Sequence, residues 1–121
     1  MTHGGSLDLV LEAADRLAED GITAEVVDLR VLRPLDEATV VRSVTRTHRA
    51  VVVDEGWRSV GLSAEVAALL AERCFYELDA PVARVCSAEV PIPYARHLEQ
   101  AALPSAARVV SAAREVVGAP G

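Results

Sequence analysis

The hydrophobic positions of this chain form short consecutive runs separated by longer runs with helical spacing. Val51, Val52 and Val53 are consecutive and β-branched, so the sequence predicts a strand at residues 50–54 that is covered on both faces. Strands of this kind are typical of a parallel sheet that lies between layers of helices. The stretch from residue 49 to 70 then continues through acids and glycines into a helical pattern.

Helical spacing predicts four helices, and Ser6 and Asp36 stand where N-caps of the first two are expected. Leu35 and Val40 would form a hydrophobic staple at the start of the second helix. Gly21 ends the first apolar run. The expected helices cover residues 7–20, 36–48, 62–77 and 105–117, with a short helical turn over 94–101.

Strands are expected at residues 24–29, 50–54 and 82–86, between these helices. The alternation of helix and strand implies right-handed crossovers and a mostly parallel sheet. Residues 87–94 are expected to be a rigid loop, because Pro91 and Pro93 lack backbone donors. The sequence therefore predicts one domain over residues 1–121, a three-layer α/β/α fold.

Composition excludes several classes of function. The formal net charge of −6 and the lack of a basic cluster argue against nucleic-acid and anionic-membrane binding. The chain contains no lysine, so a Schiff base, a P-loop lysine or a lysine general base is excluded. Cys74 and Cys86 are expected to be buried free thiols. With no signal peptide and no membrane-length apolar run, we expect a protein of the reducing cytoplasm.

Asp54 and Glu55 stand at the carboxyl end of the central strand, followed by Gly56 and Trp57. Open α/β sheets place ligands and partners at that end of their strands. The alternative is that the two acids cap or flank the next helix, and the residues alone leave both interpretations open. A Mg²⁺-binding receiver-like domain is a further analogy of fold, and the lack of lysine counts against it.

The remaining residues do not indicate an active site that this chain could form alone. His3, His48 and His97 are far apart and have no second ligand at metal-binding spacing, so no metal site is predicted. The serines lack a G-x-S-x-G elbow. Gly4-Gly5 before the first helix could hold a phosphate, but a glycine-rich strand exit explains it more simply.

Several motifs resemble one family closely. They are Arg33-Pro34-Leu35-Asp36, Glu55-Gly56-Trp57 and Pro91-Ile92-Pro93-Tyr94, within a match over about residues 4–117. Together they resemble the carboxyl-terminal domain of the beta subunit of thiamine-diphosphate-dependent 2-oxoacid dehydrogenases, which has the transketolase carboxyl-terminal fold.

The resemblance implies a part in oxidative decarboxylation of a 2-oxoacid (pyruvate, branched-chain or acetoin type), with the acyl group passed to a dihydrolipoyl acyltransferase core. Thiamine diphosphate and Mg²⁺ are bound in that family by the alpha subunit and the preceding half of the beta subunit. We therefore expect no catalytic, cofactor or metal residue here, an isolated chain without activity, and an oligomer with those partners. Interface contacts are expected from Glu55, Gly56, Trp57, Pro93, Tyr94 and His97.

The amino end departs from the family pattern. The family has an edge strand and a central strand that ends near Thr2-His3-Gly4, so the first strands are expected to be missing. Residues 24–29 and 50–54 would then either pair directly or flank a groove with unpaired backbone groups. We expect a fragment, a split-gene product or an obligate partner-bound subunit. The alternative function is a free-standing interaction module whose sheet is completed by a partner strand.

Overall fold

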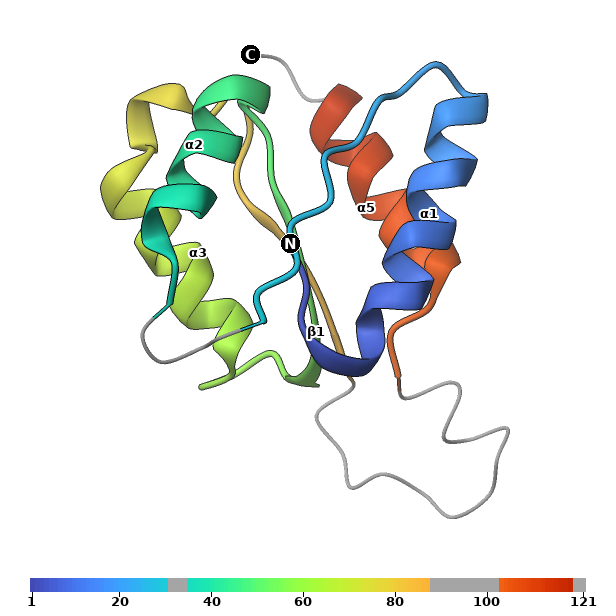
Figure 1. The fold of residues 1–121 in the computed structure, drawn as a ribbon, viewed down its shortest axis with the longest axis horizontal. Helices are drawn as coiled ribbons and strands as arrows, with labels where there is room; N and C mark the ends of the chain where they lie inside the picture. The colour runs from blue at the N-terminus through green and yellow to red at the C-terminus, as the bar shows by residue number, and fades with distance from the viewer. Residues whose placement is uncertain (31–34, 88–102, 119–121) are drawn as a thin grey trace.

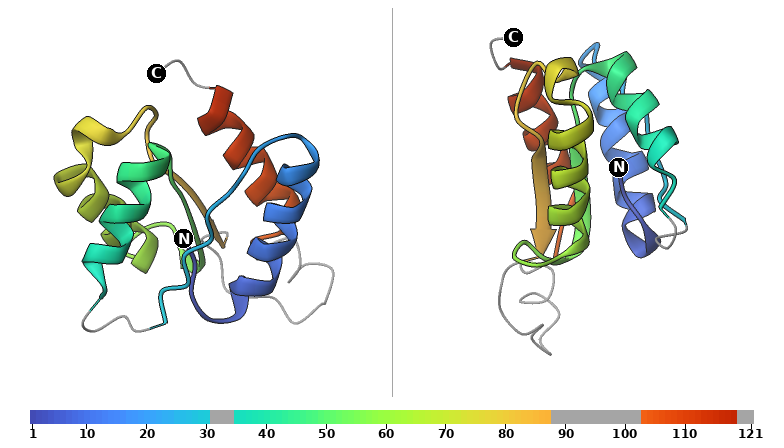
Figure 2. Two further views of the ribbon diagram at one scale, coloured as in Figure 1. Left: turned by 45° about the horizontal axis from the view of Figure 1, so that its top comes forward. Right: turned by 90° about the vertical axis from the view of Figure 1, so that its left-hand side faces the viewer.

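The computed structural model describes residues 1–30, 35–87 and 103–118, and it has three layers (Figure 1). Helices α1 (Leu7–Glu19) and α5 (Ala106–Gly118) cover one face of the sheet, and α2 (Glu37–Thr47) and α3 (Leu62–Arg73) cover the other. The sheet between them contains β1 (Val51–Trp57) and β2 (Ala83–Ser87), as the side view in Figure 2 also shows. The predicted α/β/α architecture is confirmed.

The central strand is buried on both faces. β1 pairs with β2 in parallel, with Val53 opposite Val85. Val53 packs in the apolar cluster below α1 and α5, and Val52 packs in the cluster below α2 and α3. Each valine is only 1% exposed. Full burial of a valine stabilises the fold by about 1.5–3 kcal/mol, so the consecutive valines hold both helical layers to the sheet.

Only one of the two expected N-caps is made by a side chain. Asp36 accepts a hydrogen bond from the Thr39 N–H at 3.1 Å, as predicted for α2. Ser6 is the N-cap residue of α1, as predicted, but its side chain makes no capping hydrogen bond. The reason is that a 3-10 turn, η1 (Gly4–Ser6), runs directly into α1 and leaves Ser6 with a helical backbone, its hydroxyl buried without a partner among the described residues.

Helix α3 ends earlier than its sequence pattern predicts. It stops at Arg73, and a separate 3-10 turn, η2 (Phe75–Glu77), follows. Phe75 and Tyr76 project outward there, 66% and 96% exposed. The helix was predicted to reach residue 77 because residues 75 and 76 are apolar. In the structure these two side chains do not lie on the buried face of α3. No helix among residues 1–30, 35–87 and 103–118 is long and apolar enough to cross a membrane.

Residues 24–29 do not form the predicted strand. They are extended but contribute only an isolated parallel bridge between Thr2 and Asp28. The Thr2 N–H donates to the Val27 carbonyl at 3.0 Å, and the Leu29 N–H donates to the Thr2 carbonyl at 2.7 Å. A β-ladder requires several consecutive residues on a neighbouring strand. Thr2 is a single bridging residue, so no ladder forms here.

Met1 and Thr2 occupy the place between this extended segment and β1. The Met1 ammonium donates to the Val51 carbonyl at 2.8 Å, and the Val53 N–H donates to the Met1 carbonyl at 2.9 Å. The two residues therefore connect residues 24–29 to β1 through backbone hydrogen bonds. Residues 24–29 and β1 do not pair directly, so of the two expected arrangements the structure has the flanked groove.

Candidate functional site

The carboxyl end of β1 is organised by one buried carboxylate. Asp54 is 3% exposed. Its Oδ1 accepts hydrogen bonds from the Gly56 N–H at 2.9 Å and from His3 Nε2 at 3.2 Å. Its Oδ2 accepts a hydrogen bond from the Ser63 N–H at 3.0 Å. The carboxylate thus connects the chain start, the loop after β1 and the first turn of α3.

These contacts set the charge of Asp54. Burial raises the pKa of its carboxyl group, but hydrogen bonds from the Gly56 and Ser63 amides and from His3 outweigh burial and lower the pKa below its usual value. The side chain is therefore an anion at neutral pH with its oxygens already occupied. An ionised carboxylate with these partners is a structural acceptor rather than a proton donor.

Asp54 also replaces the missing cap of α3. The N-cap position is Gly61, which has no side chain to accept from the first turn. A Cβ on Gly61 would lie 2.2 Å from the Trp57 carbonyl oxygen, so any other residue here would force the loop open. The capping interpretation of Asp54 is confirmed, and Asp54 Oδ2 accepts the N–H that an N-cap side chain would accept.

Glu55 and Gly56 lie in the same turn. The Glu55 carbonyl accepts a hydrogen bond from Ser87 Oγ at the end of β2, and its exposed carboxylate lies against Gly5, where a Cβ would approach Oε1 to 3.0 Å. A Cβ on Gly56 would lie 3.2 Å from Asp54 Oδ1. Both positions are therefore fixed by close packing.

The loop presents apolar side chains to solvent. Trp57 is 49% exposed and Val60 is fully exposed. Val60 has φ of 59°, a left-handed conformation that is strained for a β-branched residue. Arg58 and Arg84 fix the adjacent backbone, because each donates to the other's carbonyl, at 3.2 and 2.8 Å. A loop that is fixed by hydrogen bonds and exposes apolar side chains is suited to contact with another protein.

The groups around Asp54 do not form a reaction centre. Ser63 Oγ lies 3.2 Å from Cys86 Sγ, but both side chains are buried and closed to a substrate. In the described ranges no three metal-ligating side chains come together. The expected interface residues Glu55, Gly56 and Trp57 are the last three residues of β1, where its pairing with β2 becomes irregular. Pro93, Tyr94 and His97 lie outside the described residues.

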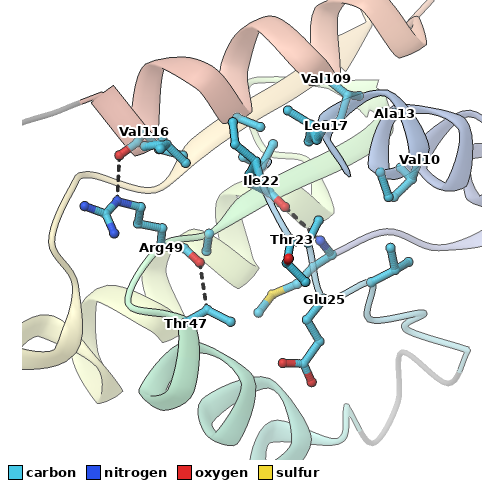
Figure 3. Close-up of a pocket in the computed structure, with 18 of the residues that line it drawn as sticks. Val10, Ala13, Leu17, Ile22, Thr23, Glu25, Thr47, Arg49, Val109 and Val116 are labelled. Carbon is cyan, nitrogen blue, oxygen red and sulfur yellow. Dashed lines mark hydrogen bonds between the residues drawn. The ribbon is translucent and has the colours of Figure 1, made fainter. Parts of the chain in front are cut away.

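A second feature is an apolar groove of about 260 Å³ that extends from Met1 between residues 24–26 and the start of β1 (Figure 3). Val10, Ala13, Leu17, Val109 and Val116 line its α1–α5 side. Ser43 and Thr47 of α2 line its opposite side.

Two site features were missed by the sequence analysis. Ser43 and Thr47 could have been found, because they lie on the inward helical face with Val40 and Val44. The His3 contact with Asp54 spans 51 positions in the sequence, and no sequence pattern indicates it.

The fold defines a class: a three-layer α/β domain with a parallel sheet. The chain belongs to the family described as "Transketolase, C-terminal domain", whose profile matches residues 1–109. The expected family resemblance is thereby confirmed.

The relatives are pyruvate dehydrogenase proteins. The chain is 48% identical over 106 residues to the mitochondrial pyruvate dehydrogenase E1 component subunit beta of Dictyostelium discoideum, covering 88% of this chain and 30% of that protein. It is 46% identical over 114 residues to the Arabidopsis thaliana subunit beta-1, covering 94% and 31%. The chain thus spans about a third of the length of these relatives.

Among solved structures, the chain is similar to one titled "Split gene transketolase, inactive beta4 tetramer". The TM-score is 0.83 at 29% identity, and the match covers 99% of this chain and 38% of that one. The similarity supports both the parallel sheet and the three-layer arrangement.

Proposed function

We propose that this chain is the carboxyl-terminal assembly domain of the beta subunit of a 2-oxoacid dehydrogenase, of the pyruvate, branched-chain or acetoin type. It would associate with the alpha subunit and the remaining half of the beta subunit, and support docking of the dihydrolipoyl acyltransferase core. The observation that carries the proposal is the end of β1 together with the loop that follows it. Its polar groups are satisfied internally, whereas Trp57 and Val60 face outward.

Catalysis is assigned to the partners. The oxygens of Asp54 are occupied by protein donors, and the described residues form no cluster suited to Mg²⁺. The residues present therefore do not fit thiamine diphosphate or its metal. The isolated chain is proposed to be inactive, and its two free thiols, Cys74 and Cys86, agree with a reducing cytoplasm.

Co-purification with the partner subunits tests the proposal. A carboxyl-terminally tagged chain is expected to retain the alpha subunit and the rest of the beta subunit through size-exclusion chromatography. Trp57→Ala should weaken this association at least about ten-fold, as for an aromatic interface anchor. Leu11→Ala is the matched control, because Leu11 on α1 is similarly exposed, 45% against 49%, but lies outside the loop. Equal retention by both variants, or no association at all, would contradict the proposal.

A further inference from the structure

The loop after β1 brings Arg58 against Arg84 of β2. Arg58 Nη1 donates to the Arg84 carbonyl at 3.2 Å, and Arg84 Nη1 donates to the Arg58 carbonyl at 2.8 Å. The two side chains therefore run past each other, and each guanidinium lies at the backbone of the other residue. Because these bonds hold both side chains, two positive charges keep fixed places next to Trp57, whose side chain is half exposed.

Arg58 and Arg84 have no acidic partner among the residues that the structure describes. Glu55, the nearest exposed acid in the sequence, places its carboxylate against Gly5 instead. The contrast is with the arginines that do form ion pairs with carboxylates, which are Arg16, Arg30, Arg46, Arg49, Arg73 and Arg114. A chain with a formal net charge of −6 thus presents an uncompensated positive site beside the end of β1.

The free edges of the two guanidiniums suit carboxylates. A guanidinium has several N–H donors in a planar fork that matches the two oxygens of a carboxylate. Each backbone contact uses Nη1, so within the described ranges Nε and Nη2 of Arg58 and Arg84 have no acceptor. Nε–H and Nη2–H point the same way and form the edge that binds a carboxylate side-on.

The Arg58 contact also has a structural role. The Ala83 N–H donates to the Ala50 carbonyl at 3.1 Å, so the Arg84 carbonyl, one residue further on, points to the outer edge of β2. A charged side chain on such an edge prevents unwanted strand pairing. A neutral amide could donate the same bond, so edge protection does not account for two guanidiniums placed next to Trp57.

We propose that Arg58 and Arg84 bind two carboxylates of an acidic segment of a partner protein, whose apolar side chains cover Trp57 and Val60. This inference rests on the proposed function, since it names the chemistry of the partner surface that the end of β1 contacts. Complementary charges orient two proteins, and tryptophan and arginine are the side chains that most often dominate affinity at an interface.

Peptide binding to the 121-residue chain, followed by NMR, tests this directly. The probe is acetyl-Leu-Glu-Ala-Glu-Leu-amide, and its neutral match is acetyl-Leu-Gln-Ala-Gln-Leu-amide. Trp57 is the only tryptophan, so its indole N–H gives a single signal. We expect the probe to shift that signal and the Nε–H signals of Arg58 and Arg84. The neutral peptide should bind at least about ten-fold more weakly.

Matched variants separate charge recognition from a general effect of lost charge. Arg58→Gln and Arg84→Gln should each weaken probe binding about five-fold or more, because each removes one carboxylate contact. Arg58→Lys keeps the charge but not the planar fork, so its affinity should lie between wild type and Arg58→Gln. Arg42→Gln is the control, because Arg42 is an exposed arginine of α2 whose Nη2 donates to Thr39 of the same helix. It should bind the probe as wild type does.

Three outcomes would overturn the proposal. They are no shift at millimolar probe in a chain with dispersed amide signals, equal binding of the acidic and neutral peptides, and equal binding of inorganic phosphate and the probe. The last would mean an anion site without preference for a protein partner. No dehydrogenase subunit is present in this experiment, so failure of the peptide leaves the proposed assembly role standing. Failure of subunit association likewise leaves the peptide result standing.

Discussion

Asp54 holds together three parts of the chain that are distant in sequence. Replacement by alanine would leave the N–H groups of Gly56 and Ser63 without their acceptor. Because a buried donor left unsatisfied costs about 1–3 kcal/mol, we expect Asp54→Ala to lower the free energy of unfolding by about 3 kcal/mol. Urea unfolding at neutral pH measures this. Asp54→Asn retains one acceptor oxygen and should lose less, so equal stability of all three proteins would contradict the assignment.

The lowered pKa of Asp54 also predicts a pH dependence. The carboxyl group binds a proton less readily in the folded chain than in the unfolded chain, where its pKa is about 3.9. Its contribution to stability is therefore fully present above that value and is lost as the pH falls through the lower, folded-state pKa. The stability difference between wild type and Asp54→Asn should be constant from about pH 5 to 7 and shrink below about pH 4. A difference that grows on acidification would contradict this sign.

At the scale of elements, the starts of α1 and α2 look alike in sequence and differ in structure. Asp36 accepts from both the N–H and the hydroxyl of Thr39, and these bonds lower its pKa. Ser6 makes no capping bond, and its hydroxyl is buried. Asp36→Ala should therefore lower the thermal midpoint, whereas Ser6→Ala should leave it unchanged or raise it. Differential scanning calorimetry of both variants checks this, and a larger loss for Ser6→Ala would contradict it.

Periodicity predicted the elements whose apolar faces are complete within the element. Helix α1 ends at Glu19 where the pattern predicted residue 20. Val52 and Val53 of β1 are buried as expected, and Val51 is partly buried. The segment at residues 24–29 has a strand-like composition, but a strand also depends on its neighbour. Among the described residues, Thr2 bridges to this segment at Asp28, so an isolated bridge forms instead of a ladder. A sequence pattern indicates the local preference for a helix or a strand. It does not indicate how long the neighbouring strand is.

The candidate site was predicted in part for the same reason. Glu55, Gly56 and Trp57 are adjacent in sequence and were predicted to follow the strand, whereas β1 continues through them to Trp57. The two interpretations of Asp54 could not be separated, because the choice depends on how α3 packs back against β1. Long-range contacts such as His3 with Asp54 arise only from that packing.

At the scale of the whole molecule, the chain is a three-layer domain with a parallel sheet between two layers of helices. Its core is formed by two apolar clusters, one on each face of the sheet. At the carboxyl end of β1, the Asp54 carboxylate accepts hydrogen bonds from backbone N–H groups and thereby stabilises the fold. The surfaces that remain are an apolar loop and an apolar groove. The chain matches one family over residues 1–109 and spans about a third of the length of its relatives.

The central claim is that this chain contributes contact surface while the reacting groups lie on its partners. The direct measurement is decarboxylation of a 2-oxoacid with thiamine diphosphate and Mg²⁺ present, assayed for the 121-residue chain alone, for the alpha subunit with the remaining half of the beta subunit, and for all three together. We expect turnover only in the complete mixture. Turnover by the isolated chain, or full activity of the partners without it, would contradict the account.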